Sequence, residues 1–365
     1  MDPGVREAVA VGRRPRIDVL ELERSLGASL YDFGHLRDGT SRGQRGLAAA
    51  ARRTGQWSAM LALAVAGRVS TDEVVYATGE DVGFVLAAVL QARSASGPAL
   101  VVRLEEPSYG RTVWRRAVFD LHRHNALRRI DRLVCRTAAH LQYLHAVERV
   151  PMHKLAVVSE STDEVFFSPE RALADPPGDL PAMSQPYIVA AGLEKRDYDT
   201  LVQAVDGLPV GVVIGAGSPW RRGGYQRGGS RPLPPNVTVS SFDPKQMRAL
   251  YHRAAFVVVP VTPTLRACGM NVVLEGWAMG KAVIATRTAG LVDAVTEGVN
   301  GMLVEPYDVE GWRSAILRLL SDPGTASELG RAGRELVATR RRLPRFVATI
   351  EELLDSAARA RGSRT

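Results

Sequence analysis

The fold is decided by residues 255–304, which read AFVVVPVTPTLRACGMNVVLEGWAMGKAVIATRTAGLVDAVTEGVNGMLV. Phe256 to Pro260 is a continuous apolar run of the length of a buried parallel strand. A loop leads to Gly269, and a helical pattern follows from Asn271 to Met279. Ala282 to Ala285 is a second buried run. The segment therefore predicts a strand, a glycine loop, a helix and a second strand of a parallel sheet.

This order of elements favours an anion site at the start of the helix. The first backbone N–H groups and the helix dipole point to one place, and we predict that Gly269, Met270 and Asn271 form a phosphate cradle there. Glu275, one turn further on, repels phosphate but suits neighbouring hydroxyl groups such as those of a ribose. The structural alternatives are an ordinary strand-to-helix turn and a carboxylate buried in a salt bridge.

The same alternation of strands and helices runs along the whole chain and predicts an α/β protein with two doubly wound parallel sheets. A proline-rich stretch without a period, residues 169–186, is the predicted linker between them. We also expect a strand at 17–22, a basic helix at 113–130 and a surface excursion at 220–235, while residues 28–53 are rich in glycine and arginine and show no strong period. The predicted strands of the first sheet are 73–77, 99–104 and 133–135, and those of the second are near 187–191, 210–214, 237–240, 255–260, 282–286 and 302–304.

Composition limits the class of protein. A chain of 365 residues with 45% hydrophobic and 24% charged residues is typical of a soluble globular protein of two domains. It contains no apolar run of about 18 residues and no apolar signal region at the N-terminus, so we expect a cytoplasmic protein. Cys135 and Cys268 fall in separate predicted domains, which argues against a disulfide framework or a cysteine metal site.

The net charge of +8 comes almost entirely from arginine, a bias that is more typical of genome composition than of function. Nucleic acid is disfavoured as a partner because no zinc-finger spacing, aromatic RNA-binding strand or helix-turn-helix frame is present. A basic surface is instead suited to phosphorylated donors, acidic acceptors or peripheral contact with anionic lipid headgroups.

The run from Glu275 to Ala285, EGWAMGKAVIA, resembles the donor-site signature of the family 4 glycosyltransferases, also called glycosyl transferases group 1. Asp293, Glu297, Asn300 and their neighbours to Pro306 resemble the run that follows it in that family. The resemblance implies that Glu275 holds the ribose of a nucleotide diphospho-sugar. One departure is informative: the family's first Glu of this signature, near the transferred sugar, corresponds here to Ala267.

A second resemblance lies at Ile188 to Asp206, IVAAGLEKRDYDTLVQAVD, where the family binds the donor diphosphate after a glycine turn. The family's Arg after Gly192 is replaced by Leu193, so Lys195 and Arg196 are the candidates for the positive charge. Cations there would offset the charge that grows on the departing diphosphate. The structural alternative is a solvated helix start paired with nearby aspartates.

The resemblance also implies the domain organisation. It predicts the GT-B fold, in which two Rossmann-like domains face a central cleft. Residues 1–168 would bind the acceptor and residues 187–342 the donor, and the helix 343–365 would return to pack on the first domain. Val157 to Pro169 resembles the family's connecting segment.

Five further residues are weaker site candidates. Gly215 follows a strand of the donor domain, and Cys268 is a small filler of the donor loop rather than a nucleophile. Glu105 ends a strand of the first domain and is the candidate base or acceptor ligand. Glu80 lies at a strand-to-helix turn, where helix capping is the alternative. His35 is a minor candidate.

The resemblance therefore implies a retaining, metal-independent glycosyltransferase with no cofactor beyond its nucleotide-sugar co-substrate. The acceptor would be a small molecule, a glycan or a lipid-linked molecule, and the protein a monomer or homodimer. Two alternatives stay open: a nucleotide-sugar-binding protein without transferase activity, which Ala267 motivates, and another GT-B sugar-nucleotide enzyme such as an epimerase.

Overall fold

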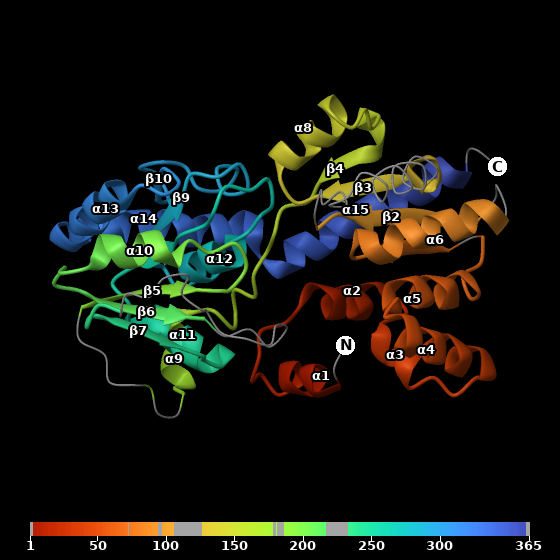
Figure 1. Cartoon of the computed structure of the whole chain (residues 1–365), viewed down its shortest axis with the longest axis horizontal. Helices are drawn as coiled ribbons and strands as arrows, with labels where there is room; N and C mark the ends of the chain where they lie inside the picture. Colours follow the sequence, from red (N-terminus) through yellow and green to blue (C-terminus); the bar gives the residue numbers. More distant parts are fainter. Residues whose placement is uncertain are drawn as a thin grey trace. The chain divides into compact units, whose positions relative to one another are not determined.

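The computed structural model describes residues 3–71, 73–93, 97–105, 126–177, 180, 186–216 and 233–362 (Figure 1). The chain forms two compact units. Unit 1 comprises Met1–Glu7, Asp18–Ser159 and Phe346–Thr365, and unit 2 comprises Ala8–Ile17 and Glu160–Arg345. Each is built around its own parallel sheet.

Unit 2 contains a six-stranded parallel sheet in the order β10-β9-β8-β5-β6-β7. Its apolar strands are buried on both faces, as parallel sheets require. From β5 the chain adds β6 and β7 on one side, then returns to add β8, β9 and β10 on the other. The order therefore reverses between β5 and β8. The strands are β5 (Tyr187–Ala191), β6 (Gly211–Gly215), β7 (Val237–Ser240), β8 (Val257–Val259), β9 (Val283–Thr286) and β10 (Met302–Val304).

Helices cover both faces of this sheet, which makes it doubly wound. Alternate strand residues such as Val189 and Val257 pack with α11 (Pro244–Arg253), α12 (Met270–Ala278) and the π-helix η2 (Val337–Arg341). Their neighbours Ile188 and Val258 pack with α10 (Tyr198–Val205) and α13 (Val309–Ser321) on the opposite face (Figure 1). The remaining helices of the unit are α9 (Pro169–Ala174) and α14 (Pro323–Leu336).

Unit 1 contains a four-stranded parallel sheet in the sequential order β1-β2-β3-β4. Leu100 and Val102 of β2 face a cluster with the N-terminal helices, while Ala99 and Val101 face α2 and α15. The last helix, α15, contributes Phe346 and other apolar residues to that second cluster. The elements are α1 (Pro3–Ala10), α2 (Asp18–Leu26), α3 (Phe33–Arg37), α4 (Arg42–Thr54), α5 (Trp57–Ala66), β1 (Val74–Ala77), α6 (Glu80–Arg93), β2 (Ala99–Arg103), β3 (Arg132–Cys135), α8 (Ala138–Ala146), η1 (Met152–Lys154), β4 (Leu155–Val157) and α15 (Leu343–Gly362).

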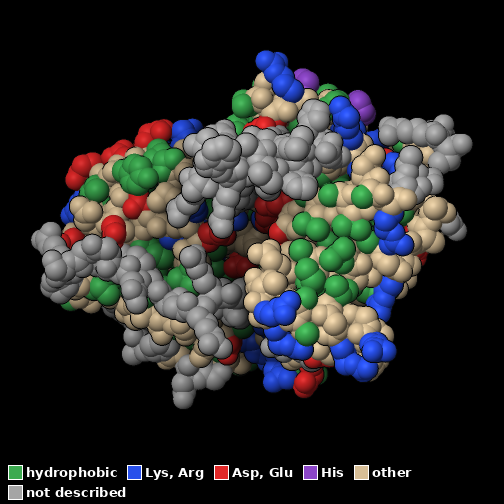
Figure 2. Space-filling model, turned by 45° about the vertical axis from the view of Figure 1, so that its right-hand side comes forward, with side chains coloured by type: hydrophobic (Ala, Val, Ile, Leu, Met, Phe, Trp, Pro, Cys, Tyr) green, Lys and Arg blue, Asp and Glu red, His purple; other side chains and the backbone are tan. Residues whose placement is uncertain are grey.

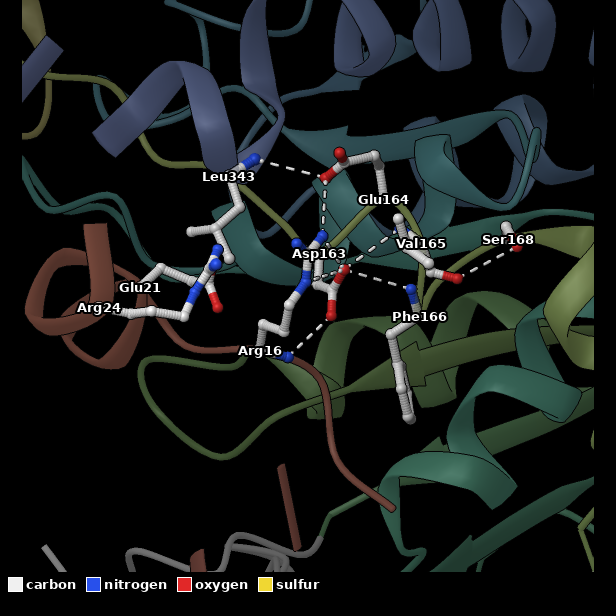
Figure 3. A network of polar contacts seen from close by, with 9 residues as sticks. All are labelled: Arg16, Glu21, Arg24, Asp163, Glu164, Val165, Phe166, Ser168 and Leu343. Carbon is white, nitrogen blue, oxygen red and sulfur yellow. Dashed lines mark hydrogen bonds and ion pairs between the residues drawn. The ribbon is translucent and has the colours of Figure 1, made fainter. Parts of the chain in front are cut away.

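The boundaries of the two units differ from the expected domain limits near the N-terminus and at the expected linker. Residues 8–17 belong to unit 2, where Arg16 binds Asp163 (Figure 3). The second unit begins at Glu160, and the start of the expected linker is the helix α9, which Ser168 caps. Asp175, after that helix, pairs with Arg248 of α11 at 3.1 Å and fixes the segment to unit 2. The rest of the expected linker lies largely outside the described residues.

One local prediction was wrong. The strand expected at 17–22 is instead the start of helix α2, which begins at Asp18. Residues 28–53, whose sequence shows no strong period, contain α3 and most of α4. Most of the predicted helix 113–130 and of the excursion 220–235 lies outside the described residues. Within the part of the chain that the structure describes, no helix is long and apolar enough to cross a bilayer.

Candidate functional site

The reversal of strand order between β5 and β8 marks the candidate site of unit 2. In doubly wound sheets, ligands bind outside the carboxyl ends of the strands at such a reversal. The chain after β5 contains Gly192 and Lys195, and the chain after β8 leads through Gly269 into α12. The sequence-predicted donor residues 192–196 and 267–275 therefore come from the loops and the helix that border this point.

Gly269 fixes the start of α12. It is the N-cap residue and has φ of +90°, a left-handed conformation that glycine adopts without steric cost. A Cβ at this position would lie 2.6 Å from Val259 Cγ1 and 3.0 Å from Val261 Cγ2. The glycine thus lets the helix begin directly against the end of β8.

The amides at the start of α12 are only partly available. The N–H of Met270 donates to the carbonyl of Ala267 at 3.1 Å, and the N–H of Val273 donates to Gly269. The first N–H groups of a helix have no acceptor inside it. Asn271 and Val272 therefore carry the backbone donors that suit an anion here. Of the three residues predicted to form the phosphate cradle, Gly269 forms the turn before α12 and Asn271 offers a backbone N–H. The N–H of Met270 is used inside the loop, by its bond to Ala267.

Lys195 and Arg196 differ sharply in their surroundings. Arg196 is half-buried: its Nε donates to the Ala191 carbonyl and its Nη1 to the Glu194 carbonyl, both at 2.7 Å. It also fills the space beside Gly192, whose φ is +96° and where a side chain would collide with the guanidinium. Lys195 is exposed. Within the described residues its ammonium has no hydrogen bond or ion pair, so Lys195 is the cation open to a ligand.

Backbone hydrogen bonds join the two loops at the reversal point. The Thr262 N–H donates to the Lys195 carbonyl at 2.9 Å, and the Asp197 N–H donates to the Pro260 carbonyl at 3.1 Å. Lys195 itself is held at φ of +53°, which is uncommon for a residue with a side chain. Strain of this kind concentrates at functional sites. It is maintained here because bonds on both sides fix the backbone.

A side-chain ion pair adds a further link between these loops. Arg266 Nη1 lies 2.6 Å from Glu194 Oε1. The Arg266 side chain is mostly buried and that of Glu194 is exposed. A charge pair thus stands directly before Ala267.

Glu275 is half-buried on α12 and accepts a hydrogen bond from the Tyr251 hydroxyl at 2.9 Å. Burial raises the pKa of Glu275 to about 7, although the Tyr251 hydrogen bond and the positive charge of Arg196 both act to lower it. The carboxylate is therefore poised between its charged and neutral forms at physiological pH. A ligand hydroxyl that donates to it would favour the charged form.

Ala267 and Cys268 belong to the core more than to the surface of the donor loop. Their exposures are 6% and 8%, and both pack in the cluster that contains α11 and α12. Gly290 lies against the Arg266 carbonyl so closely that it has no room for a Cβ. Burial raises the pKa of the other cysteine, Cys135 in unit 1, to about 12.

Gly215 ends β6 and acts on the site through the backbone. Its carbonyl accepts the Gly192 N–H at 3.0 Å, which anchors the turn after β5. A Cβ on Gly215 would lie 2.9 Å from Met247 Sδ. Gly217, two residues further along the chain, lies outside the described residues.

The acceptor-side candidates Glu80 and Glu105 are brought together in unit 1. The Glu105 N–H donates to Glu80 Oε2 at 2.7 Å. The Glu105 carboxylate forms ion pairs with Arg136 and, at 3.6 Å, with Arg103. Both of its oxygens are thus engaged by arginine, which fits a held, positioning carboxylate. His35 Nδ1 lies 2.9 Å from Asp32 Oδ1 on α3, apart from this pair.

Sequence reasoning assigned no role to Tyr251, the partner of Glu275. A signal existed, because Tyr251 stands next to Ala249 and Leu250 on α11 and a buried tyrosine needs a partner for its hydroxyl. It also overlooked the Glu194–Arg266 pair. Among the described residues, no group of His, Cys, Asp and Glu side chains could hold a metal ion.

Comparison with known sequences finds its family match in unit 2. The family model described as glycosyl transferases group 1 matches residues 187–322. The lipopolysaccharide core biosynthesis glycosyltransferase LpsE of Rhizobium meliloti is 31% identical over 170 residues, 46% of this chain and 47% of that protein. The D-inositol 3-phosphate glycosyltransferase of Mycobacterium marinum is 31% identical over 265 residues, 70% of this chain and 53% of the relative. The chain spans about half the length of the curated relatives it matches.

Comparison with solved structures establishes the fold. The structure of HepE from Anabaena in complex with UDP-glucose aligns with a TM-score of 0.62 and 16% sequence identity, over 81% of this chain and 82% of that one. Two parallel-sheet α/β units with this similarity define the GT-B fold. Within that class, residues 187–322 match the group 1 glycosyltransferases, and this match lies in the unit that holds the candidate site.

Proposed function

We propose that this protein is a glycosyltransferase that moves a sugar from a nucleotide diphospho-sugar to an acceptor hydroxyl, with retention of anomeric configuration and without a metal ion. One observation carries the proposal. The start of α12, the exposed ammonium of Lys195 and the Glu275 carboxylate all border the reversal of strand order in unit 2. The relatives named glycosyltransferases and the HepE complex with UDP-glucose support it.

Each of these groups suits one part of the donor. The Asn271 and Val272 amides and the dipole of α12 suit the diphosphate. Lys195 supplies a positive charge for the phosphate oxygens, and charge-assisted contacts of this kind are strong. Glu275 accepts hydrogen bonds from the ribose hydroxyls. Arg196 shapes the Gly192 turn, and its charge acts on Glu275.

The proposed reaction proceeds on one face of the sugar. The bond from the anomeric carbon to the diphosphate oxygen breaks, and a bond from the same carbon to the acceptor oxygen forms on the same side. The acceptor proton passes to an oxygen of the departing diphosphate. The protein contributes positioning and electrostatic stabilisation by Lys195 and the helix dipole, so no protein nucleophile is needed.

The acceptor side is proposed to lie in unit 1, with Glu80 and Glu105 as ligands for acceptor hydroxyls. Lys and Arg side chains gather on the lower right of the face in Figure 2. Such a surface favours acceptors that carry phosphate or other anionic groups, and peripheral contact with anionic lipid. Relatives named for D-inositol 3-phosphate and for lipopolysaccharide core agree with a phosphorylated or glycan acceptor. Helix α4 of unit 1 contributes four exposed arginines to its basic surface: Arg42, Arg45, Arg52 and Arg53.

A nucleotide-sugar-binding protein without transfer is the second candidate. The observation that favours it is Ala267, which is buried where the related signature has a Glu. A buried methyl group cannot hydrogen-bond the sugar. The epimerase alternative has no observation of its own in its favour. Because transferases of this kind draw on nucleotide sugars made in the cytoplasm, we propose that location.

The test is nucleotide release from UDP-, GDP-, ADP- and TDP-sugars, with and without phosphorylated and glycan acceptors. Release that depends on an acceptor, persists in EDTA and yields a product of the donor's anomeric configuration supports the full proposal. Binding of a donor without release under any acceptor supports the binding protein. Activity that EDTA abolishes, or an inverted product, contradicts the proposed mechanism while leaving transfer intact.

A further inference from the structure

The side chain of Tyr251 touches the proposed ribose carboxylate from outside the donor loops. Its hydroxyl donates to Glu275 Oε2 at 2.9 Å. Among the residues that the structure describes, this is the one hydrogen bond of the Glu275 side chain. Within the described residues, the other oxygen, Oε1, has no hydrogen-bond partner. A hydrogen bond at one oxygen restricts rotation of the carboxylate and so limits the directions in which the second oxygen can point.

The Tyr251 ring is itself immobile. The residue is 0% exposed, and its ring packs edge-on against Phe167, with centroids 6.2 Å apart and an interplanar angle of 63°. Phe167 packs in turn on Phe166 at 5.0 Å. Core aromatic side chains at this density have no alternative rotamer at small cost. The hydroxyl therefore reaches Glu275 from a rigid support on a different helix.

The direction of the hydrogen bond is fixed by chemistry. Burial and the nearby Glu275 charge raise the pKa of Tyr251 well above its ordinary value, so the hydroxyl keeps its proton and donates. The groups that act on Glu275 are Tyr251 on α11 and Arg196 in the turn after β5. Arg341 of η2, which also packs near α12, instead interacts with Asp293 and Glu160. Tyr251 is thus the direct stabiliser of the charged carboxylate.

We infer that Tyr251 is a positioning residue for nucleotide recognition: it holds Glu275 so that Oε1 accepts the ribose hydroxyls. The inference rests on the proposed function, because it requires a nucleotide donor at this site. In this role Tyr251 supports nucleotide binding through Glu275 without itself touching the ligand, which explains why a tyrosine stands at this position. A phenylalanine would pack equally well, so the hydroxyl alone makes the difference.

The test compares Tyr251→Phe with Tyr187→Phe. Tyr187 is also buried in unit 2, but its hydroxyl donates to the Leu250 carbonyl at 3.1 Å and not to Glu275. Binding of UDP, GDP and ADP is measured by calorimetry, and the tightest is compared with its 2′,3′-dideoxy analogue. We expect the wild type and Tyr187→Phe to bind the dideoxy analogue about tenfold more weakly. Tyr251→Phe should lose most of that preference.

A pH series separates positioning from general damage. Loss of the Tyr251 hydrogen bond disfavours the charged form of the Glu275 carboxylate. The preference for the nucleotide over its dideoxy analogue should therefore begin at a higher pH in Tyr251→Phe than in the wild type. An unchanged preference and an unchanged pH profile in Tyr251→Phe would overturn the inference. Glu275→Gln is the second variant: if it keeps the full ribose preference, Glu275 is not the ribose ligand and the inference fails. Failure of the wild type to bind any nucleotide would instead refute the proposed function.

Discussion

Arg16 and Asp163 form an ion pair across 147 positions of the sequence, in which Nε and Nη2 of Arg16 both donate to Asp163 Oδ1, at 3.0 and 2.7 Å (Figure 3). The Arg16 backbone N–H also donates to Asp163 Oδ2 at 2.8 Å. Asp163 is 5% exposed. This contact explains why residues 8–17 belong to unit 2 although the residues on both sides of them belong to unit 1.

Replacement of Arg16 by alanine should therefore destabilise unit 2. Asp163 keeps hydrogen bonds from the Val165 and Phe166 N–H groups, so the loss is smaller than for a fully abandoned buried charge. We expect a decrease of about 1–3 kcal/mol in the free energy of unfolding, measured by urea denaturation. Arg331→Ala, at an exposed site of α14, is the control. Equal free energies of unfolding for Arg16→Ala and Arg331→Ala would show that the Arg16–Asp163 pair does not anchor residues 8–17 to unit 2.

Replacement of Gly269 by alanine should damage the start of α12 for two reasons. The residue has positive φ, which costs alanine about 1–2 kcal/mol. Its Cβ would also lie 2.6 Å from Val259 Cγ1, and overpacking of this kind costs about 1–3 kcal/mol.

Gly207→Ala is the matched control for Gly269→Ala. Gly207 has φ of +73° but open space where a Cβ would stand, so it reports the backbone cost alone. Urea denaturation should show the larger loss for Gly269→Ala. Equal losses would contradict the close approach of the helix to β8.

The second unit was largely predictable because its signals are local. The apolar runs at 187–191 and 255–260 are buried on both faces of a parallel sheet, and such strands carry their signature in a few consecutive residues. The glycine turns at Gly192 and Gly269 also stand out, since both need positive φ. The error at 17–22 has a local cause as well: the short apolar run IDVLEL resembles a strand, but Leu22 and Leu26 share one helical face.

What remained hidden depends on contacts between distant residues. The Arg16–Asp163 pair and the Tyr251–Glu275 hydrogen bond join segments whose proximity no local pattern encodes. The distinction between Lys195 and Arg196 is of the same kind, because it depends on which side chain folds back onto the Gly192 turn. The start of helix α4, in contrast, was visible in the sequence, because Ser41 and Gln44 have the residue types and spacing of a capping box.

Replacement of Lys195 by glycine should separate stability from ligand binding. Glycine accepts the positive φ of this position, so the free energy of unfolding should stay within about 0.5 kcal/mol or rise. Loss of the ammonium should weaken binding of UDP or another nucleoside diphosphate about tenfold and leave the nucleoside unaffected. Calorimetric titration with both ligands measures the difference.

Tyr307→Gly controls for the backbone change in Lys195→Gly. Tyr307 also has positive φ, +63°, and is 59% exposed. The Tyr307→Gly variant should bind the nucleoside diphosphate and the nucleoside as the wild type does. A parallel loss of nucleoside and diphosphate binding in Lys195→Gly would show that the lysine shapes the loop and does not contact the phosphate.

The raised pKa of Glu275, about 7, makes the stability of the unliganded protein depend on pH. In the unfolded chain this carboxyl group titrates near its ordinary value of 4.5, so between that value and about 7 the folded state binds more protons than the unfolded state. The stability that the neutral carboxyl contributes is therefore fully present below about pH 4.5 and is lost as the pH rises to about 7. The loss is on the order of 1–3 kcal/mol.

Glu275→Gln should remove this dependence, because an amide does not titrate and still accepts the Tyr251 hydrogen bond. Urea denaturation of the wild type and of Glu275→Gln at pH 5 and pH 8 measures it. We expect the variant to gain stability relative to the wild type on going from pH 5 to pH 8. A difference between the two proteins that stays constant over this range would mean that Glu275 is already charged at pH 5, and that the ligand site is preformed as an anion before any nucleotide binds.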